Sequence, residues 1–132
     1  MIYFDNASTE RMNPRVAEGI LPYLTNKYGN PSSSHTIGRE ARADINKARQ
    51  TIAELLNLQN YRTIFNSGGS EANNQALMTA YRMGIEQGKN RIIISEIEHD
   101  SVYKTAKSLE HRGFEIVTIP VDRDGFVSPM DV

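Results

Sequence analysis

Hydrophobic positions in the first part of the chain recur every three or four residues, which is the spacing of one helix face. Asn13 and Pro14 predict the start of a helix, because asparagine caps helices and proline is favoured at the first helical position. Pro22 predicts that this helix kinks or ends near Leu21. A longer helix is predicted from about Gly38, with an apolar stripe of Ala41, Ile45, Ala48, Ile52 and Leu55.

From residue 63 onward, short apolar runs alternate with helical patterns. Residues 63–65, 91–95 and 114–119 are predicted strands, and a helix is predicted over about 70–85. Another helix, with Val102, Ala106 and Leu109 on one side, ends at Gly113. This alternation predicts an α/β fold with a parallel sheet. The continuous apolar run 91–95 predicts a strand that is buried on both faces.

The two ends of the chain carry turn signals. Residues 3–7 predict a short strand that enters an Asx turn at Asp5 or Asn6. Ser128 and Pro129 predict the start of a further helix, yet the sequence stops at Val132. We therefore expect these 132 residues to be part of a longer fold.

Composition narrows the range of partners. The chain has 15 basic and 16 acidic residues, so no strong field of one sign would attract nucleic acid or an anionic membrane. It has no cysteine, which excludes disulfides and thiolate metal sites. No signal peptide and no apolar run of about 20 residues is recognisable. The sequence predicts a cytoplasmic chain that contacts neither nucleic acid nor membrane.

The glycine turn, residues 66–70, is the first candidate site, since it follows a predicted strand and precedes a helix. Gly68 and Gly69 allow unusual backbone shapes and a close approach of backbone amides to a ligand. Ser70 adds a hydroxyl at the positive end of the helix dipole. The turn matches neither the P-loop nor the dinucleotide-binding pattern. These residues alone leave two interpretations open: a phosphate cradle, or a plain strand-to-helix turn capped by Ser67 or Ser70.

His99 is the second candidate, in the turn after the next strand, where Asp100 or Ser101 could cap the following helix. An imidazole there could transfer protons or lie against a flat ligand, although a hydrogen-bonded loop histidine is equally compatible with the residues. Glu96 and Glu98 flank it, but no second histidine has metal-ligand spacing, so we expect no metal site. The polar loop 29–35 is a weaker candidate.

Four segments together resemble one enzyme family. They are residues 3–9 (YFDNAST), 29–33 (GNPSS), 67–74 (SGGSEANN) and 98–99 (EH). Their order and spacing are similar to those of the cysteine desulfurases of the NifS and IscS type, which are pyridoxal-phosphate enzymes with the class V aminotransferase fold. The resemblance covers essentially the whole chain.

The resemblance implies a fold and a cofactor site. The fold would be part of a three-layer sandwich with a mostly parallel sheet, the N-terminal part of a fold type I pyridoxal-phosphate enzyme. Within a single incomplete domain, 1–132, residues 1–37 would carry loops at the active-site mouth, and 38–132 would begin the large cofactor-binding domain. Gly69 and Ser70 correspond to the pair that holds the cofactor phosphate, with serine in place of the usual threonine. His99 corresponds to the histidine that stacks on the pyridine ring and assists proton transfer.

The resemblance also implies an activity: conversion of L-cysteine to L-alanine, with the sulfur left as an enzyme-bound persulfide for iron–sulfur cluster assembly. Its partners would be a second copy in a homodimer, a complementary C-terminal chain or a sulfur-acceptor scaffold protein. The family's Schiff-base lysine, its aspartate on the pyridine nitrogen and its nucleophilic cysteine have no counterpart in this sequence. We therefore expect no turnover by this chain alone.

Three explanations for the short length remain open. The chain could be a truncated product, half of a split enzyme, or a non-catalytic binding or scaffold remnant of a class V aminotransferase-like protein. The sequence does not distinguish cysteine from selenocysteine or another amino-acid substrate.

Overall fold

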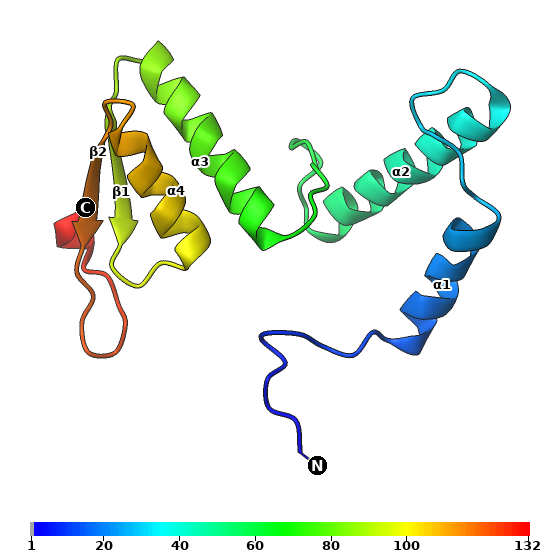
Figure 1. Cartoon of the computed structure of the whole chain (residues 1–132), viewed down its shortest axis with the longest axis horizontal. Coiled ribbons are helices and arrows are strands. Elements are labelled where there is room, and N and C mark those ends of the chain that lie inside the picture. The colour runs from blue at the N-terminus through cyan, green and yellow to red at the C-terminus, as the bar shows by residue number, and fades with distance from the viewer. Residues whose placement is uncertain (1) are drawn as a thin grey trace. The chain divides into compact units, whose positions relative to one another are not determined.

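The computed structural model describes residues 2–132, which divide into two units, Met1–Ile64 and Phe65–Val132. Figure 1 shows the elements of both units along the chain. The first unit holds α1 (Pro14–Thr25) and α2 (Thr36–Leu55). The second holds α3 (Gly69–Glu86), β1 (Arg91–Ser95), α4 (Asp100–Glu110), β2 (Glu115–Ile119) and the short 3-10 helix η1 (Pro129–Asp131).

Helix α1 begins where the sequence predicts, but its predicted end is wrong. The Asn13 side chain accepts a hydrogen bond from the Arg15 amide at 2.9 Å and caps the helix. The helix continues through Pro22 to Thr25, and the amides of Asn26 and Lys27 both donate to the Pro22 carbonyl at 2.8 Å. A proline inside a helix lacks an amide donor and its ring crowds the carbonyl four residues earlier, but its own carbonyl still accepts from the amides that follow.

The loop before α2 is held against that helix by close backbone contacts. A side chain at Gly38, which is buried, would lie 2.6 Å from the carbonyl oxygens of Asn30 and Ser33. Arg42 donates to the Pro31 carbonyl at 2.7 Å, and His35 caps the helix by accepting from the Gly38 amide at 3.3 Å. The loop 29–35 is therefore built into the first unit, and its cap starts α2 two residues earlier than expected.

The N-terminal segment differs from the expected strand and Asx turn. The amides of Ser8 and Thr9 donate to the backbone oxygen of Asp5, at 3.1 and 3.3 Å. The Tyr3 hydroxyl donates to the carbonyl oxygens of Asp5 and Thr9. The turn is thus closed by the main chain and by a tyrosine, and no strand is present in residues 2–9.

The second unit contains a βαβ arrangement, which confirms the α/β class and the parallel sheet. Strands β1 and β2 are parallel neighbours in register from Arg91 opposite Glu115 to Ser95 opposite Ile119. Helix α4 connects them and packs on β2, while α3 packs on α4. The buried side chains come from these elements and the turn before β2: Ile94, Ala106, Leu109, Phe114 and Ile119.

Two expectations about the strands are wrong. The run 63–65 is not a strand, and the described sheet contains only β1 and β2. Ile93 in the middle of β1 keeps 40% of its surface exposed, whereas Ile94 keeps 6%. Short apolar runs become strands only through neighbouring strands and covering layers, and these described elements cover one face of β1.

The remaining elements agree with the sequence. Helix α3 spans the predicted range, and the Ser128 hydroxyl caps η1 by accepting from the Met130 amide at 3.2 Å. None of the helices in residues 2–132 combines the length and the apolar character needed to cross a membrane.

Candidate cofactor-binding site

The N-termini of α3 and α4 lie at one end of the second unit. Figure 1 shows both strand arrows pointing toward the end where these two helices begin. The carboxyl ends of parallel strands are where open α/β folds bind ligands. The structure therefore places the Ser70 turn and the His99 turn at the edge where such a fold forms its site.

The glycine turn is open to a ligand, although one reason given for its glycines is wrong. Gly68 has φ 166° and ψ −177°, an extended backbone that any residue adopts, and Gly69 is the first residue of α3. Apart from the chain neighbours and the backbone of α3 itself, no described atom lies within 4 Å of a Cβ built on Gly68 or Gly69. The glycines therefore leave free space beside the amides of this turn rather than permitting an unusual backbone.

Donor groups at the start of α3 have no side-chain cap. Gly68 is the N-cap residue and makes no side-chain hydrogen bond to the first turn. The first amides of a helix have no acceptor within the helix and carry the positive end of its dipole. The exposed Ser70 hydroxyl has no hydrogen-bond partner among the described residues. These groups fit an anion such as a phosphate.

Glu71 stabilises the turn from inside the helix. Its carboxylate accepts from the Ser67 amide at 2.7 Å and from the Ser67 hydroxyl at 2.6 Å. These two hydrogen bonds, the one from the hydroxyl first, lower the pKa of Glu71 from its ordinary value of 4.5. Ser67 is therefore a donor to the carboxylate and not a helix cap, which leaves the first-turn amides available.

His99 itself is the cap of α4, in place of the expected Asp100 or Ser101. Its Nδ1 accepts from the Ser101 amide at 3.1 Å and lies 2.8 Å from the Ser101 hydroxyl. Asp100 instead accepts from the Lys104 ammonium at 2.6 Å, and this hydrogen bond lowers the pKa of the Asp100 carboxyl. The ring is exposed, and Nε2 has no partner among the described residues.

Two side-chain bridges join α3 to α4, and neither was predicted from the sequence. The Asn73 amide donates to the Ser101 hydroxyl at 2.9 Å. The Thr105 hydroxyl lies 2.6 Å from the Asn74 side-chain oxygen and 2.7 Å from the Ser101 carbonyl oxygen. These bridges fix the helix that carries Ser70 relative to the helix that carries His99. Their only sequence signal is the pair of asparagines one turn into α3, where a packed helix face would normally be apolar.

Three of the five lysines form ion pairs with carboxylates at the surface. Lys27 pairs with Asp44 at 2.8 Å, Lys104 with Asp100 at 2.6 Å, and Lys107 with Glu110 at 2.8 Å. The hydrogen bonds to these carboxylates raise the pKa values of Lys27 and Lys107 above the ordinary 10.5. Since only the neutral amine attacks an aldehyde, these surface pairs make Lys27 and Lys107 poor attachment points for pyridoxal phosphate.

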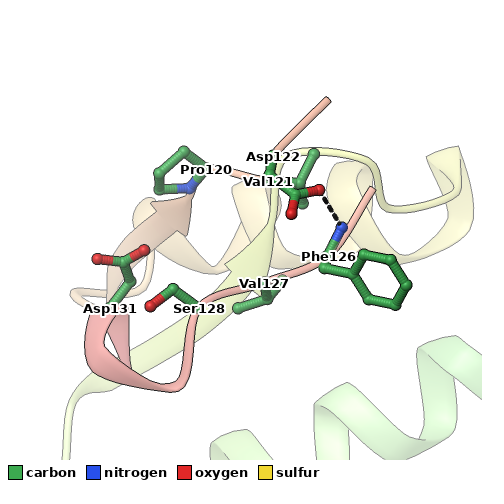
Figure 2. Close-up of a pocket in the computed structure, with 7 residues that line it drawn as sticks. All are labelled: Pro120, Val121, Asp122, Phe126, Val127, Ser128 and Asp131. Carbon is green, nitrogen blue, oxygen red and sulfur yellow. Dashed lines mark hydrogen bonds between the residues drawn. The ribbon is translucent and has the colours of Figure 1, made fainter. Parts of the chain in front are cut away.

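A separate cavity of about 270 Å³ lies in the C-terminal segment (Figure 2). It is lined by residues of 120–131, and Asp122 at its wall accepts from the amides of Asp124 and Phe126, both at 2.9 Å. Asp122 is engaged in closing its own turn, and the lining carboxylates of Asp122 and Asp131 are acceptors that do not match the phosphate of a cofactor. Among residues 2–132, no group of three or more His, Cys, Asp or Glu side chains could hold a metal ion.

The loops 29–33 and 5–9 belong to the first unit, whereas Ser70 and His99 belong to the second. Their expected places at an active-site mouth stay predictions. The expected division of the chain at residue 37 also stays a prediction.

Comparison with known proteins identifies the family. The family model for class-V aminotransferases matches residues 2–132, and the chain belongs to this family. It is 46% identical over 127 residues to cysteine desulfurase IscS 1 of Archaeoglobus fulgidus, and 43% identical over 131 residues to cysteine desulfurase IscS of Dictyoglomus turgidum. These matches cover 96% and 99% of this chain.

Solved structures agree with the sequence relatives. A NifS-like protein matches 98% of this chain with a TM-score of 0.91 and 37% identity. DndA from Streptomyces lividans matches 89% with a TM-score of 0.71 and 36% identity. These findings confirm the resemblance to NifS and IscS proteins and the fold class drawn from it.

The chain spans about a third of the length of these relatives. It covers 33% of each of the two cysteine desulfurases and 35% of the NifS-like protein. The family implies pyridoxal phosphate as the cofactor, and the first-turn donors of α3 fit its phosphate.

Proposed function

We propose that this chain forms the phosphate-binding and ring-stacking part of the pyridoxal-phosphate site of a cysteine desulfurase. The observation that carries the proposal is the uncapped, sterically open N-terminus of α3 beside the His99 turn. Identity of 46% to a cysteine desulfurase over 96% of the chain supports it.

Each site residue has a defined role in this proposal. The amides of Gly69 and Ser70 and the Ser70 hydroxyl donate to the phosphate, at the positive end of the α3 dipole. The His99 ring lies against the pyridine ring and presents Nε2 toward the reacting groups. Pyridoxal phosphate, when bound, supplies the electron sink for reactions at an amino acid's α-carbon and β-carbon.

The proposed overall reaction of the complete protein is conversion of L-cysteine to L-alanine, with the sulfur passed to a cysteine as a persulfide. SspA, a structural relative that is 31% identical, was solved in complex with cysteine, which supports cysteine as substrate. Because this sequence contains no cysteine, the persulfide step requires a thiol from outside these 132 residues.

The test compares the cofactor with its phosphate-free analogue. We expect the chain to bind pyridoxal phosphate weakly, with inorganic phosphate as a competitor. Pyridoxal should bind about tenfold more weakly or worse, equivalent to about 1.4 kcal/mol. Equal affinity for both compounds, measured by titration of the cofactor absorbance, would place the binding outside the α3 turn.

Borohydride reduction provides a second measurement on the same samples. We expect no stoichiometric lysine adduct, because Lys27, Lys104 and Lys107 are ion-paired and none lies in the family's Ser-x-His-Lys setting. Mass spectrometry that locates one fully modified lysine would show a covalent cofactor site within this chain.

Two alternatives make different predictions. Half of a split enzyme requires a second chain that supplies the lysine and restores desulfurase activity when mixed with this one. A non-catalytic scaffold requires a protein partner and no phosphate-dependent cofactor binding. Phosphate-dependent binding favours the cofactor site over the scaffold.

Association and location are also proposals. Helix α1 buries none of its residues within the described chain, and Val16, Leu21 and Leu24 each expose more than half of their surface. An apolar helix face of this kind is expected to associate with a second copy, with a complementary chain or with a sulfur-acceptor protein. We propose that this association takes place in the cytoplasm.

A further inference from the structure

The nitrogen atoms of His99 have unequal surroundings. Nδ1 lies 3.1 Å from the backbone nitrogen of Ser101. A backbone N–H can only donate, so Nδ1 must be the acceptor and carries no hydrogen in this arrangement. In the neutral ring, the hydrogen is therefore on Nε2.

The Ser101 hydroxyl reinforces this state. It lies 2.8 Å from Nδ1, and it also receives a hydrogen bond from the Asn73 side-chain amide at 2.9 Å. A hydroxyl has one hydrogen to donate. Because Asn73 donates to the oxygen, the Ser101 hydrogen is free to point at Nδ1. The three residues form a directed chain of hydrogen bonds from Asn73 through Ser101 to His99.

Partial burial favours a single arrangement of this hydrogen-bond network. Asn73 and Ser101 are half-buried between α3 and α4, whereas His99 is exposed. Buried polar groups that satisfy one another hold a single arrangement better than exposed ones do, because water does not compete for them. Of the three residues in this network, only His99 is exposed.

We propose that Asn73 and Ser101 are positioning residues that fix His99 in the tautomer with its hydrogen on Nε2. The proposal rests on the proposed function, in which His99 faces the cofactor ring. It assigns Nε2–H as a hydrogen-bond donor to the cofactor or substrate, and it removes Nδ1 from any contact with them.

The chain of bonds also links the two halves of the site. Asn73 lies three residues after Ser70 on α3, and Ser101 lies two residues after His99 on α4. A displacement of α3 that moves the phosphate donors would therefore also move the group that orients the histidine. The hydrogen bond from Asn73 to Ser101 therefore couples the position of the phosphate donors to the orientation of the histidine.

The test reads the tautomer directly by nitrogen NMR of the chain labelled at its three histidines, without any cofactor. Spectra are recorded at about pH 9, well above the ordinary range of imidazole titration. Loss of one signal set in His99→Gln assigns the resonance. We expect a protonated Nε2 and an Nδ1 resonance displaced in the direction caused by accepting hydrogen bonds.

Two variants remove the hydroxyl donor in different ways. Ser101→Ala deletes it, and Asn73→Asp replaces a donor with a carboxylate that takes the Ser101 hydrogen for itself. Both should move the His99 Nδ1 resonance toward that of a free nitrogen, and by similar amounts. Thr105→Val is the control, because it removes the bridge to Asn74 and the bond to the Ser101 carbonyl oxygen but deletes no member of the Asn73–Ser101–His99 network.

Several results would overturn the proposal. They are a hydrogen on Nδ1 in the unaltered chain, an Nδ1 resonance insensitive to both variants, or an equal shift in the Thr105→Val control. None of these results bears on phosphate binding, which is measured separately with inorganic phosphate. Failure of the proposed Asn73–Ser101–His99 network and failure of the proposed cofactor site are therefore distinguishable.

Discussion

Glu71 shows at the scale of one residue how the glycine turn is held. Its pKa is lowered by two hydrogen bonds from Ser67, so the folded turn favours the ionised carboxylate. A carboxyl whose folded pKa is depressed contributes stability above its unfolded pKa and loses it as the pH falls through the folded value. The turn should therefore weaken at acid pH, starting from below about the ordinary value of 4.5.

We predict that the chemical shift of the Ser67 amide proton follows the ionisation of Glu71, with a midpoint below pH 4.5. Proton–nitrogen NMR spectra recorded across the acid range measure this shift. Glu71→Gln should abolish this titration, since the amide side chain has no charge to lose. Glu110→Gln is the control, because it removes a carboxylate paired with Lys107 at the far end of α4. A Ser67 titration that survives in Glu71→Gln would assign it to another group.

Gly69, Ser70 and His99 are proposed as site residues from the resemblance, which rests on short sequence motifs. Their structural surroundings were harder to predict. The cap made by His99 and its bond to Ser101 depend on side-chain rotamers. Asn73 contacts Ser101 across 28 residues of sequence, and no local pattern predicts a bond of that range.

At the scale of elements, α3 contains two glycines with opposite surroundings. A Cβ on Gly84 would lie 2.9 Å from the Lys89 carbonyl oxygen and 3.1 Å from the Phe114 ring. The backbone at Lys89 is itself held by its amide, which donates to the Gly84 carbonyl at 2.7 Å. Phe114 is a core residue that also packs against Tyr81 with ring centroids 4.8 Å apart.

We predict that Gly84→Ala destabilises the second unit by about 1–3 kcal/mol, because the methyl group overpacks a filled site. Gly69→Ala in the same helix meets no atom within 4 Å and should be neutral or stabilising by up to about 1 kcal/mol. Urea unfolding followed by helix circular dichroism measures both. Equal effects of the two substitutions would mean that Phe114 does not pack on α3 as described.

Helix starts could be predicted from local residues, whereas strand formation and burial could not. The starts of α1, α3 and η1 follow from capping and turn residues, which are local chemistry. Strand formation at 63–65 and burial of the outer face of β1 both depend on neighbouring strands and covering layers. The local pattern alone therefore predicted a strand and a buried face that the structure does not show. The predicted end of α1 near Leu21 is wrong because the amides of Asn26 and Lys27 still bond to the Pro22 carbonyl, whereas the alternative of a kink stays a prediction.

At the scale of the whole molecule, the family implies a pyridoxal-phosphate cofactor, and we propose that its site lies where the strands of the second unit end. The chain matches a class-V aminotransferase model over residues 2–132 and spans about a third of the length of its cysteine desulfurase relatives. In this proposal, the chain contributes the phosphate donors of α3 and the histidine of α4. The central claim is therefore that the open turn at Gly69 binds the cofactor phosphate.

The most direct measurement of that claim is the affinity of the chain for inorganic phosphate and pyridoxal phosphate, by calorimetry, before and after Gly69→Val. A Cβ at Gly69 has no described atom within 4 Å other than its chain neighbours and the backbone of α3, so valine would occupy the open space beside the turn. The helix propensity of valine is no worse than that of glycine. Gly19→Val, at another open glycine within α1, is the matched control. We predict a tenfold or greater loss of both affinities in Gly69→Val, unchanged stability, and no effect of Gly19→Val. Unchanged phosphate affinity in a folded Gly69→Val chain would contradict the account.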